Sequence, residues 1–128
     1  MEENNKKELT AYDLMIGDWV RNCNGKNKRV EQILKIGVVL NYNGTYFFDD
    51  IEPIPITEEI LLKNGFKKKM GGTFEMIYNT KCKYLIINYN PISGLLSANN
   101  LWFRANDIHY VHELQHALRY ITDKIIEL

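Results

Sequence analysis

The C-terminal segment DIHYVHELQHALRYITDKIIEL, from Asp107 to Leu128, predicts one amphipathic helix that packs on the rest of the fold. Its apolar residues recur at intervals of three and four, the spacing of one buried helix face. The members of this stripe are Val111, Leu114, Leu118, Ile121, Ile125 and Leu128. Asn106 or Asp107 is the expected N-cap. We therefore expect the aliphatic side of this helix to lie on a sheet.

The same segment contains His112-Glu113-Leu114-Gln115-His116, a match to the zinc-peptidase pattern H-E-x-x-H. Residues four apart lie one above the other on a helix, so His112 and His116 are candidate zinc ligands and Glu113 a candidate general base. A catalytic zinc site needs a third protein ligand, and no histidine follows His116. His109 lies about 10 Å from His116 along a continuous helix, too far to share one ion.

The direction of the aliphatic stripe argues against a zinc site. At about 100° per residue, the stripe is centred near Leu114 and Leu118, and the histidines and Glu113 fall on the opposite side. In a small two-layer domain that side faces water. We therefore predict no catalytic residue, no metal and no cofactor, and we keep a zinc hydrolase acting through His112, Glu113 and His116 as the least favoured alternative.

The composition is that of an ordinary globular protein. Sixteen basic and sixteen acidic residues cancel, which argues against a protein that grips nucleic acid through bulk charge. The polar start of the chain does not resemble a signal peptide, and no apolar run approaches the length of a membrane span. Cys23 and Cys82 stand far apart, in no ligand-like spacing. These features predict a cytoplasmic protein without membrane association.

The first part of the chain predicts a small antiparallel sheet. Residues 1–11 are expected to form a flexible tail, and residues 12–56 a β-sheet or barrel subdomain of four short strands. Asn43-Gly44 lies between two apolar runs and is a strong hairpin signal, because both residues tolerate positive φ.

Residues 57–128 are expected to form an αβββα half that makes one compact unit with the first subdomain. Thr57 is the expected N-cap of a short helix that ends at Asn64-Gly65. The three predicted strands of the following meander span residues 73–79, 82–90 and 95–104. The middle strand is apolar on both sides, which predicts a packed layer on each face. The expected class is therefore α+β, with an SH3-like sheet, a short helix, a three-stranded meander and a C-terminal helix.

Two groups of residues are candidate binding sites. The first consists of aromatic residues of the barrel: Trp19, Tyr46 and Phe48. The second is the densest basic cluster of the chain: Lys63, Lys67, Lys68 and Lys69. Aromatic groups on strands can stack bases and lysines can contact phosphates, but core packing and a solvated edge explain the same residues.

Three phrases of the sequence belong together: Leu14-Met15-Ile16-Gly17-Asp18-Trp19-Val20, the run IEPIPITEEIL from Ile51 to Leu61 with Lys63-Asn64-Gly65-Phe66, and YVHELQHALR from Tyr110 to Arg119. In these phrases the chain resembles a group of small proteins from gut Bacteroidetes, their prophages and mobile elements. The resemblance implies a shared origin and fold but no activity. In that group the Glu and the second His of the last phrase are not fixed. The first phrase also looks like the opening of SH3-like barrels.

These observations favour a non-enzymatic interaction protein of phage or mobile-element type. Its expected contacts with a protein partner are the barrel aromatics or the exposed face of the last helix. A homodimer is one partner arrangement that the sequence leaves open. The alternative from a different class is a nucleic-acid accessory protein that uses the cluster from Lys63 to Lys69.

Overall fold

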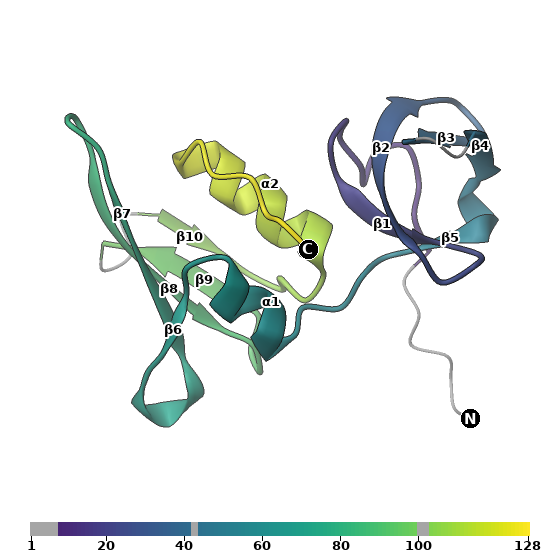
Figure 1. The fold of residues 1–128 in the computed structure, drawn as a ribbon. Helices are drawn as coiled ribbons and strands as arrows, with labels where there is room; N and C mark the ends of the chain where they lie inside the picture. The colour runs from purple at the N-terminus through teal and green to yellow at the C-terminus, as the bar shows by residue number, and fades with distance from the viewer. Residues whose placement is uncertain (1–7, 42–43, 100–102) are drawn as a thin grey trace. The chain divides into compact units, whose positions relative to one another are not determined.

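The computed structural model describes residues 8–41, 44–99 and 103–128. The chain divides into two units, of which the first ends at Ile54 and the second runs from Pro55 to Leu128 (Figure 1). Each unit contains a five-stranded antiparallel sheet, and the helices α1 and α2 belong to the second unit. The predicted α+β class with a C-terminal helix is therefore confirmed.

The sheet of the first unit has the strand order β4-β3-β2-β1-β5. Its strands are β1 (Trp19–Asn22), β2 (Asn27–Ile33), β3 (Gly37–Leu40), β4 (Gly44–Phe47) and β5 (Ile51–Glu52). The predicted hairpin is present as β3 and β4, which pair from Leu40↔Gly44 to Gly37↔Phe47, although residues 42–43 of its turn lie outside the described residues. The connector that follows contributes β5, which returns to pair with β1.

The core of the first unit is aliphatic. It consists of Leu9, Leu14, Val20, Val30, Val38, Leu40 and Ile51, with Ile33, Tyr46 and Phe48 packed against it. Leu9 is buried, and the hydroxyl and backbone N–H of Thr10 both donate to Asp13 Oδ2. Residues 8–11 belong to the predicted flexible tail over residues 1–11, and within them the apolar Leu9 side chain packs into this core.

The second unit has the strand order β10-β9-β8-β7-β6. Its elements are α1 (Glu58–Lys63), β6 (Lys67–Lys68), β7 (Phe74–Asn79), β8 (Tyr84–Asn90), β9 (Leu95–Ala98), β10 (Phe103–Ala105) and α2 (Val111–Ile121). A one-turn 3-10 helix spans Phe48–Asp50 in the first unit, and Met70–Gly72 of the second unit forms a turn in which Gly71 has a φ of 82°.

The predicted third strand, residues 95–104, is wrong as a single element. It contains two strands, β9 and β10, which pair with each other as an antiparallel hairpin, and its residues 100–102 lie outside the described residues. Asn99 leaves the strand with φ of 48°, a left-handed conformation that asparagine tolerates. Its side-chain amide bonds to β8, accepting from Ile86 N and donating to Tyr84 O.

The short helix α1 begins and ends where the sequence indicates. Thr57 is its N-cap, and the Thr57 Oγ1 accepts from Ile60 N at 3.2 Å. Gly65 follows the C-cap Asn64 with φ of 97°, a conformation that favours glycine. Leu61 is buried, so α1 contributes one apolar anchor to the core of this unit.

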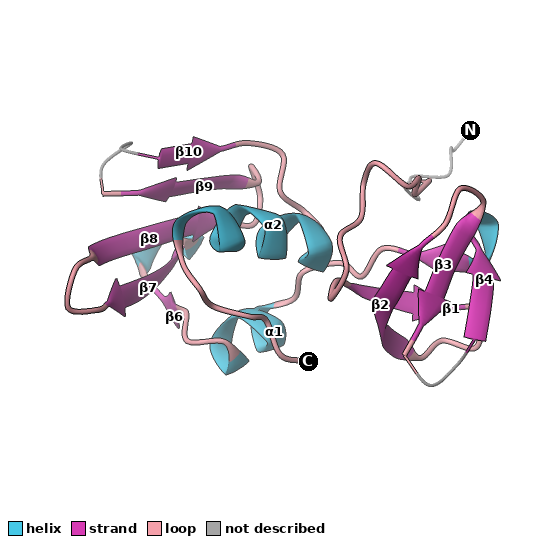
Figure 2. Cartoon of the chain, turned by 90° about the horizontal axis from the view of Figure 1, so that it is seen from above, coloured by secondary structure: helices cyan, strands magenta, loops and turns pink. Residues whose placement is uncertain are grey.

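One face of the second sheet carries the core, and α2 lies across it (Figures 1 and 2). Leu85, Ile87 and Tyr89 of β8 are buried on that face, together with Leu114 and Leu118 of α2. The opposite face carries Tyr84, 54% exposed, and Ile77, 56% exposed. The prediction of a packed layer on each face is therefore wrong for the described part of this unit, because only one face receives the helices.

The helix α2 is shorter than predicted. It begins at Val111 rather than near Asp107, and it ends at Ile121 rather than at Leu128. The Thr122 hydroxyl and backbone N–H both donate to Leu118 O at 2.7 Å, and Thr122 has an extended conformation with φ of −137°. The last residues of the stripe therefore leave the helix, and Ile125 is 52% exposed.

The end of α2 and the segment after it are held by polar side chains, both of α2 itself and of residues far away in the chain. Gln115 Nε2 donates to Lys124 O, and Gln115 Oε1 accepts from Ile126 N at 2.6 Å. Lys83 Nζ donates to Ile121 O, and the Tyr78 hydroxyl donates to Asp123 Oδ1 at 2.7 Å. This last hydrogen bond raises the pKa of Tyr78. These bonds stabilise a conformation that the apolar spacing alone does not indicate.

Candidate functional site

The two histidines of the HELQH motif lie next to each other on α2. Their ring centroids are 5.7 Å apart and the rings meet edge to face. His112 also stacks on Tyr110, with 6.2 Å between the ring centroids. Among the described residues, no group of three His, Cys, Asp or Glu side chains is placed to hold a metal ion.

The predicted exposure of these histidines is only partly correct. His109 is exposed and His116 is partly buried, but His112 and Gln115 each expose about 1% of their surface. Val111 and Leu114, their neighbours in the chain, are buried as well. Adjacent helical residues point about 100° apart, so α2 buries a wider arc than its aliphatic stripe. The prediction that the imidazoles face water is therefore wrong for His112.

Glu113 forms the N-terminal cap of α2. Its Oε1 accepts from His109 N at 3.0 Å and from Tyr110 N at 3.2 Å. Because α2 begins at Val111, Glu113 stands at the third helical position, where a carboxylate satisfies free amides and complements the helix dipole. The carboxylate that the zinc-peptidase pattern assigns as a base thus has a structural role at the start of the helix.

A groove lies between α2 and β10 in the second unit. It has a volume of about 390 Å³ and is open to solvent. Its lining from α2 is Glu113, His116, Ala117 and Tyr120, and its lining from β10 and the following loop is Phe103, Ala105, Asn106, Asp107 and Ile108. We call this site the α2–β10 groove.

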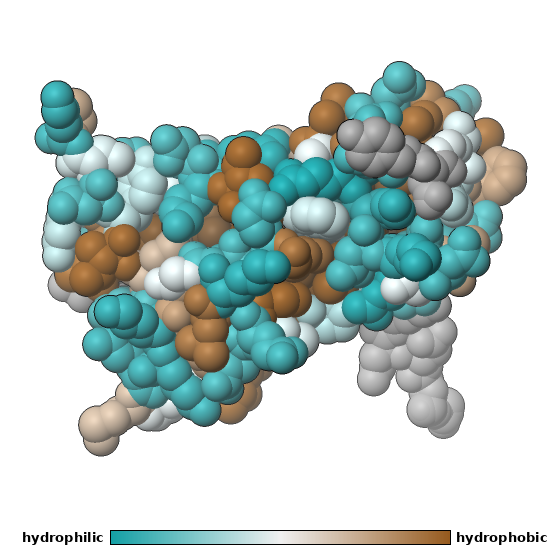
Figure 3. All heavy atoms as spheres, in the orientation of Figure 1, coloured by the Kyte–Doolittle hydropathy of each residue, from teal (hydrophilic) through white to brown (hydrophobic). Residues whose placement is uncertain are grey.

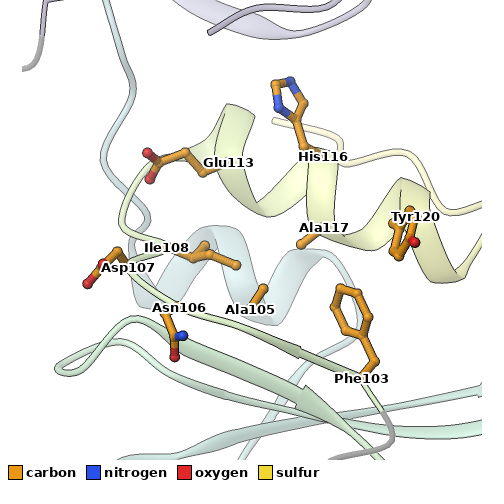
Figure 4. A pocket seen from close by; sticks show the side chains of 9 residues that line it. All are labelled: Phe103, Ala105, Asn106, Asp107, Ile108, Glu113, His116, Ala117 and Tyr120. Atoms are coloured by element: carbon orange, nitrogen blue, oxygen red, sulfur yellow. The ribbon is translucent and has the colours of Figure 1, made fainter.

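The α2–β10 groove has a polar end and an apolar end. Figure 4 shows Glu113 and Asp107 toward one end and Phe103 and Tyr120 toward the other, with the small Ala105 and Ala117 between them. The Phe103 and Tyr120 rings lie 5.5 Å apart, and Tyr120 is 80% exposed. The lining contains two carboxylates and no lysine or arginine, so the polar end favours a cation.

The floor of the groove is fixed by hydrogen bonds of Ile108. Its carbonyl accepts from the Tyr89 hydroxyl at 2.5 Å, and its N–H donates to Gly94 O at 2.9 Å. Burial, with a smaller contribution from the charge of Glu113, raises the pKa of Tyr89 to about 12. The Tyr89 phenol therefore remains protonated, as a donor to this loop, at physiological pH.

The predicted barrel aromatics do not form one surface. Arg29 lies over the Trp19 ring, 4.6 Å from its centroid, beside a depression of about 190 Å³ that is also lined by Asn27, Lys28 and Asn41. Tyr46 and Phe48 instead pack against the core of the first unit. Trp19 is thus separated from the other two by its position on the sheet.

The predicted lysine cluster is exposed but divided. Lys67 and Lys68 are consecutive residues of β6, so their side chains point to opposite faces of the sheet. Lys68 Nζ lies 3.4 Å from Glu58, and Lys69 Nζ lies 3.4 Å from Glu75. Lys63 stands in the last turn of α1. The four lysines therefore do not form one continuous basic surface.

Sequence reasoning named the exposed side of the last helix but not β10, and no local signal pairs Phe103 with Tyr120. Figure 3 shows apolar residues in several small areas of the visible face, among hydrophilic ones.

No helix among the described residues is long and apolar enough to cross a membrane. In comparisons with known proteins, no family model, no curated protein and no solved structure matches the chain.

Proposed function

We propose that the chain is a non-enzymatic interaction protein that binds a protein partner on the exposed side of α2. The observation that carries this proposal is the α2–β10 groove, which combines a pair of aromatic rings with two carboxylates. Aromatic groups beside a polar rim are the usual anchors of protein interfaces. The capping role of Glu113 supports a binding function over hydrolysis.

The proposal keeps several expectations from the sequence. These are the resemblance to Bacteroidetes and phage proteins, the SH3-like character of the first unit, the cytoplasmic location and the homodimer as an alternative partner. Binding of nucleic acid through Lys63 to Lys69 stays the alternative function. It predicts salt-dependent binding to DNA or RNA that is lost when Lys67 and Lys69 are replaced by glutamine.

The test is site-specific photo-crosslinking in the cells that produce the protein. A photoreactive amino acid at Ala117 lies in the groove, and the matched control carries it at the exposed Thr45 of β4. We expect a discrete crosslinked protein from position 117 and none of that mass from position 45. The same products from both positions, or none from position 117, would refute binding on this side of α2.

A further inference from the structure

The two edges of the second sheet differ in how they are protected. At one edge, β6 is two residues long, and both residues are lysines followed by Lys69. Short strands and lysines are devices that keep an edge from pairing with another chain. At the other edge, β10 has the sequence Phe-Arg-Ala and pairs only with β9 among the described strands. The backbone groups on its outer side are therefore a template for a further strand.

The α2–β10 groove lies beside this open edge. Phe103 pairs with Ala98 and Ala105 pairs with Leu96, so both side chains of β10 point to the face that α2 covers. A strand added next to β10 would lie about 4.8 Å away and continue the sheet beneath the flank of α2. Its alternate side chains would then enter the groove between Glu113 and Tyr120.

The length of the groove sets how many side chains it takes. Glu113 and Tyr120 are seven helical residues apart, which corresponds to about 10 Å along α2. An extended chain covers about 10 Å with three residues. Two side chains that are two positions apart therefore fit, one against Phe103 and Tyr120 and the other near Asp107 and Glu113.

From this geometry we propose that the groove takes an extended peptide segment of a partner protein as an additional strand on β10. The segment carries an apolar residue and a Lys or Arg two positions apart. Strand addition of this kind obtains affinity from main-chain hydrogen bonds and specificity from pockets for alternate side chains. This inference rests on the proposed function and specifies the chemistry of the partner.

A second copy of the chain fits the edge less well than such a peptide. A symmetric antiparallel pairing centred on β10 places Arg104 directly opposite Arg104 of the other copy. Like charges directly opposite each other destabilise a pair of strands. The β10 strand of a second copy would also bring no lysine or arginine to the acidic end of the groove. Its one basic residue, Arg104, points to the opposite face of the sheet.

The experiment uses an array of blocked octapeptides against the full-length protein. Each peptide of the first set contains one Lys and one apolar residue (Leu, Ile, Val or Phe) two positions apart, in either order, and Ser or Thr at all other positions. A matched set has Glu in place of Lys. We expect the Lys set to bind more tightly and to shift the backbone amide resonances of Phe103 to Ala105. Equal binding of both sets, or no binding at millimolar peptide, would overturn the proposal.

Protein variants locate the peptide. Ala117→Arg fills the groove and adds a repelling charge, so we expect binding to weaken by about tenfold or more. Tyr120→Ala, at a residue 80% exposed, tests the apolar end without risk to the fold. Asp107→Asn, which suits the φ of 58° at that position, should weaken the Lys peptides by about threefold and leave the Glu peptides unaffected. Thr45→Arg is the control that changes nothing.

Main-chain methylation tests the mode of binding. In an added strand, every second backbone N–H of the peptide points toward β10. N-methyl groups at these positions should weaken binding by on the order of fivefold per lost hydrogen bond, whereas N-methyl groups at the other positions should have little effect. A crosslink at Ala117 with no effect of either set would sustain the proposed function and overturn strand addition. A dimer in sedimentation that Ala117→Arg abolishes would assign the groove to a second copy and overturn the peptide.

Discussion

The side-chain amide of Asn64 pairs with the backbone of Glu127, although 63 residues separate them in the chain. Asn64 Nδ2 donates to Glu127 O, and Asn64 Oδ1 accepts from Glu127 N, each at 2.8 Å. The same Nδ2 donates to Ile60 O in α1. One side chain at the end of α1 thus holds the segment that follows α2.

Replacement of Asn64 by alanine removes all three hydrogen bonds. Because this site is partly open to water, we expect the free energy of unfolding of the second unit to fall by about 2 kcal/mol. Urea denaturation measures this change. Asn79→Ala, at the exposed end of β7, is the control and should change stability by less than about 0.5 kcal/mol. Equal effects of the two substitutions would show that the Asn64 clamp contributes little.

Substitutions of Glu113 distinguish a structural role at the start of α2 from a role as a catalytic base. Glu113→Ala removes the acceptor for two amides and should cost about 1 kcal/mol of stability. Glu113→Gln retains an accepting oxygen, so we expect it to recover at least half of that loss. Thermal denaturation of both variants checks this order. In a zinc peptidase, by contrast, both variants would abolish peptide hydrolysis to a similar extent.

Metal content provides an independent test of the HELQH motif. We expect substoichiometric zinc in the purified protein and no change of melting temperature on addition of a chelator. His116→Ala is the informative variant, because His116 is only partly buried and its loss should spare the fold. One zinc per chain in the wild type, lost in His116→Ala, would contradict the absence of a metal site.

Gly94 supports the floor of the groove. It has φ of 76°, and a Cβ atom there would lie 2.8 Å from the His109 ring and from Ile108 N. Gly94→Ala should therefore cost about 3 kcal/mol through strain and crowding together. Gly71→Ala is the matched control, because Gly71 has φ of 82° and no atom within 4 Å of the added Cβ. We expect it to cost only about 1 kcal/mol in the same urea denaturation assay.

The raised pKa of Tyr89 leads us to expect a loss of stability at alkaline pH. Burial raises its pKa from 10 to about 12 in the folded protein, so above pH 10 the unfolded chain releases this proton first. The contribution of Tyr89 to stability is complete below pH 10 and decreases as the pH rises from 10 toward 12. Tyr89→Phe should lower stability at pH 7, through loss of the bond to Ile108 O, but should reduce the decline above pH 10. A parallel decline in both proteins would contradict a buried, protonated Tyr89.

Local signals in the sequence predicted the elements that depend on neighbouring residues. Thr57 caps α1 because its hydroxyl reaches an amide three residues later, and the alternation of β8 separates Leu85 and Ile87 from Tyr84 and Ile86. Such signals need no knowledge of the rest of the chain. For this reason the α+β class and the order of the main elements were predictable.

The errors arise where distant residues decide the structure. The apolar spacing continues to Leu128, but Gln115 and Asn64 hold the last segment in a non-helical conformation. Asn99 ends β9 through a left-handed φ and bonds to β8, which its position in an apparently continuous strand does not indicate. The groove was not predictable in full either, because it forms only when β10 reaches the flank of α2.

The place of Glu113 in the first turn of α2 has a consequence for the interpretation of short motifs in other genomes. A glutamate at the third position of a helix turns back toward the amides that precede it, whereas the same residue deeper in a helix leaves its carboxylate available to act as a base. The residue at which the helix starts is therefore a simple filter for large-scale searches for this peptidase motif. Chains in which the acid falls within the first turn can be set aside before any assay for hydrolysis.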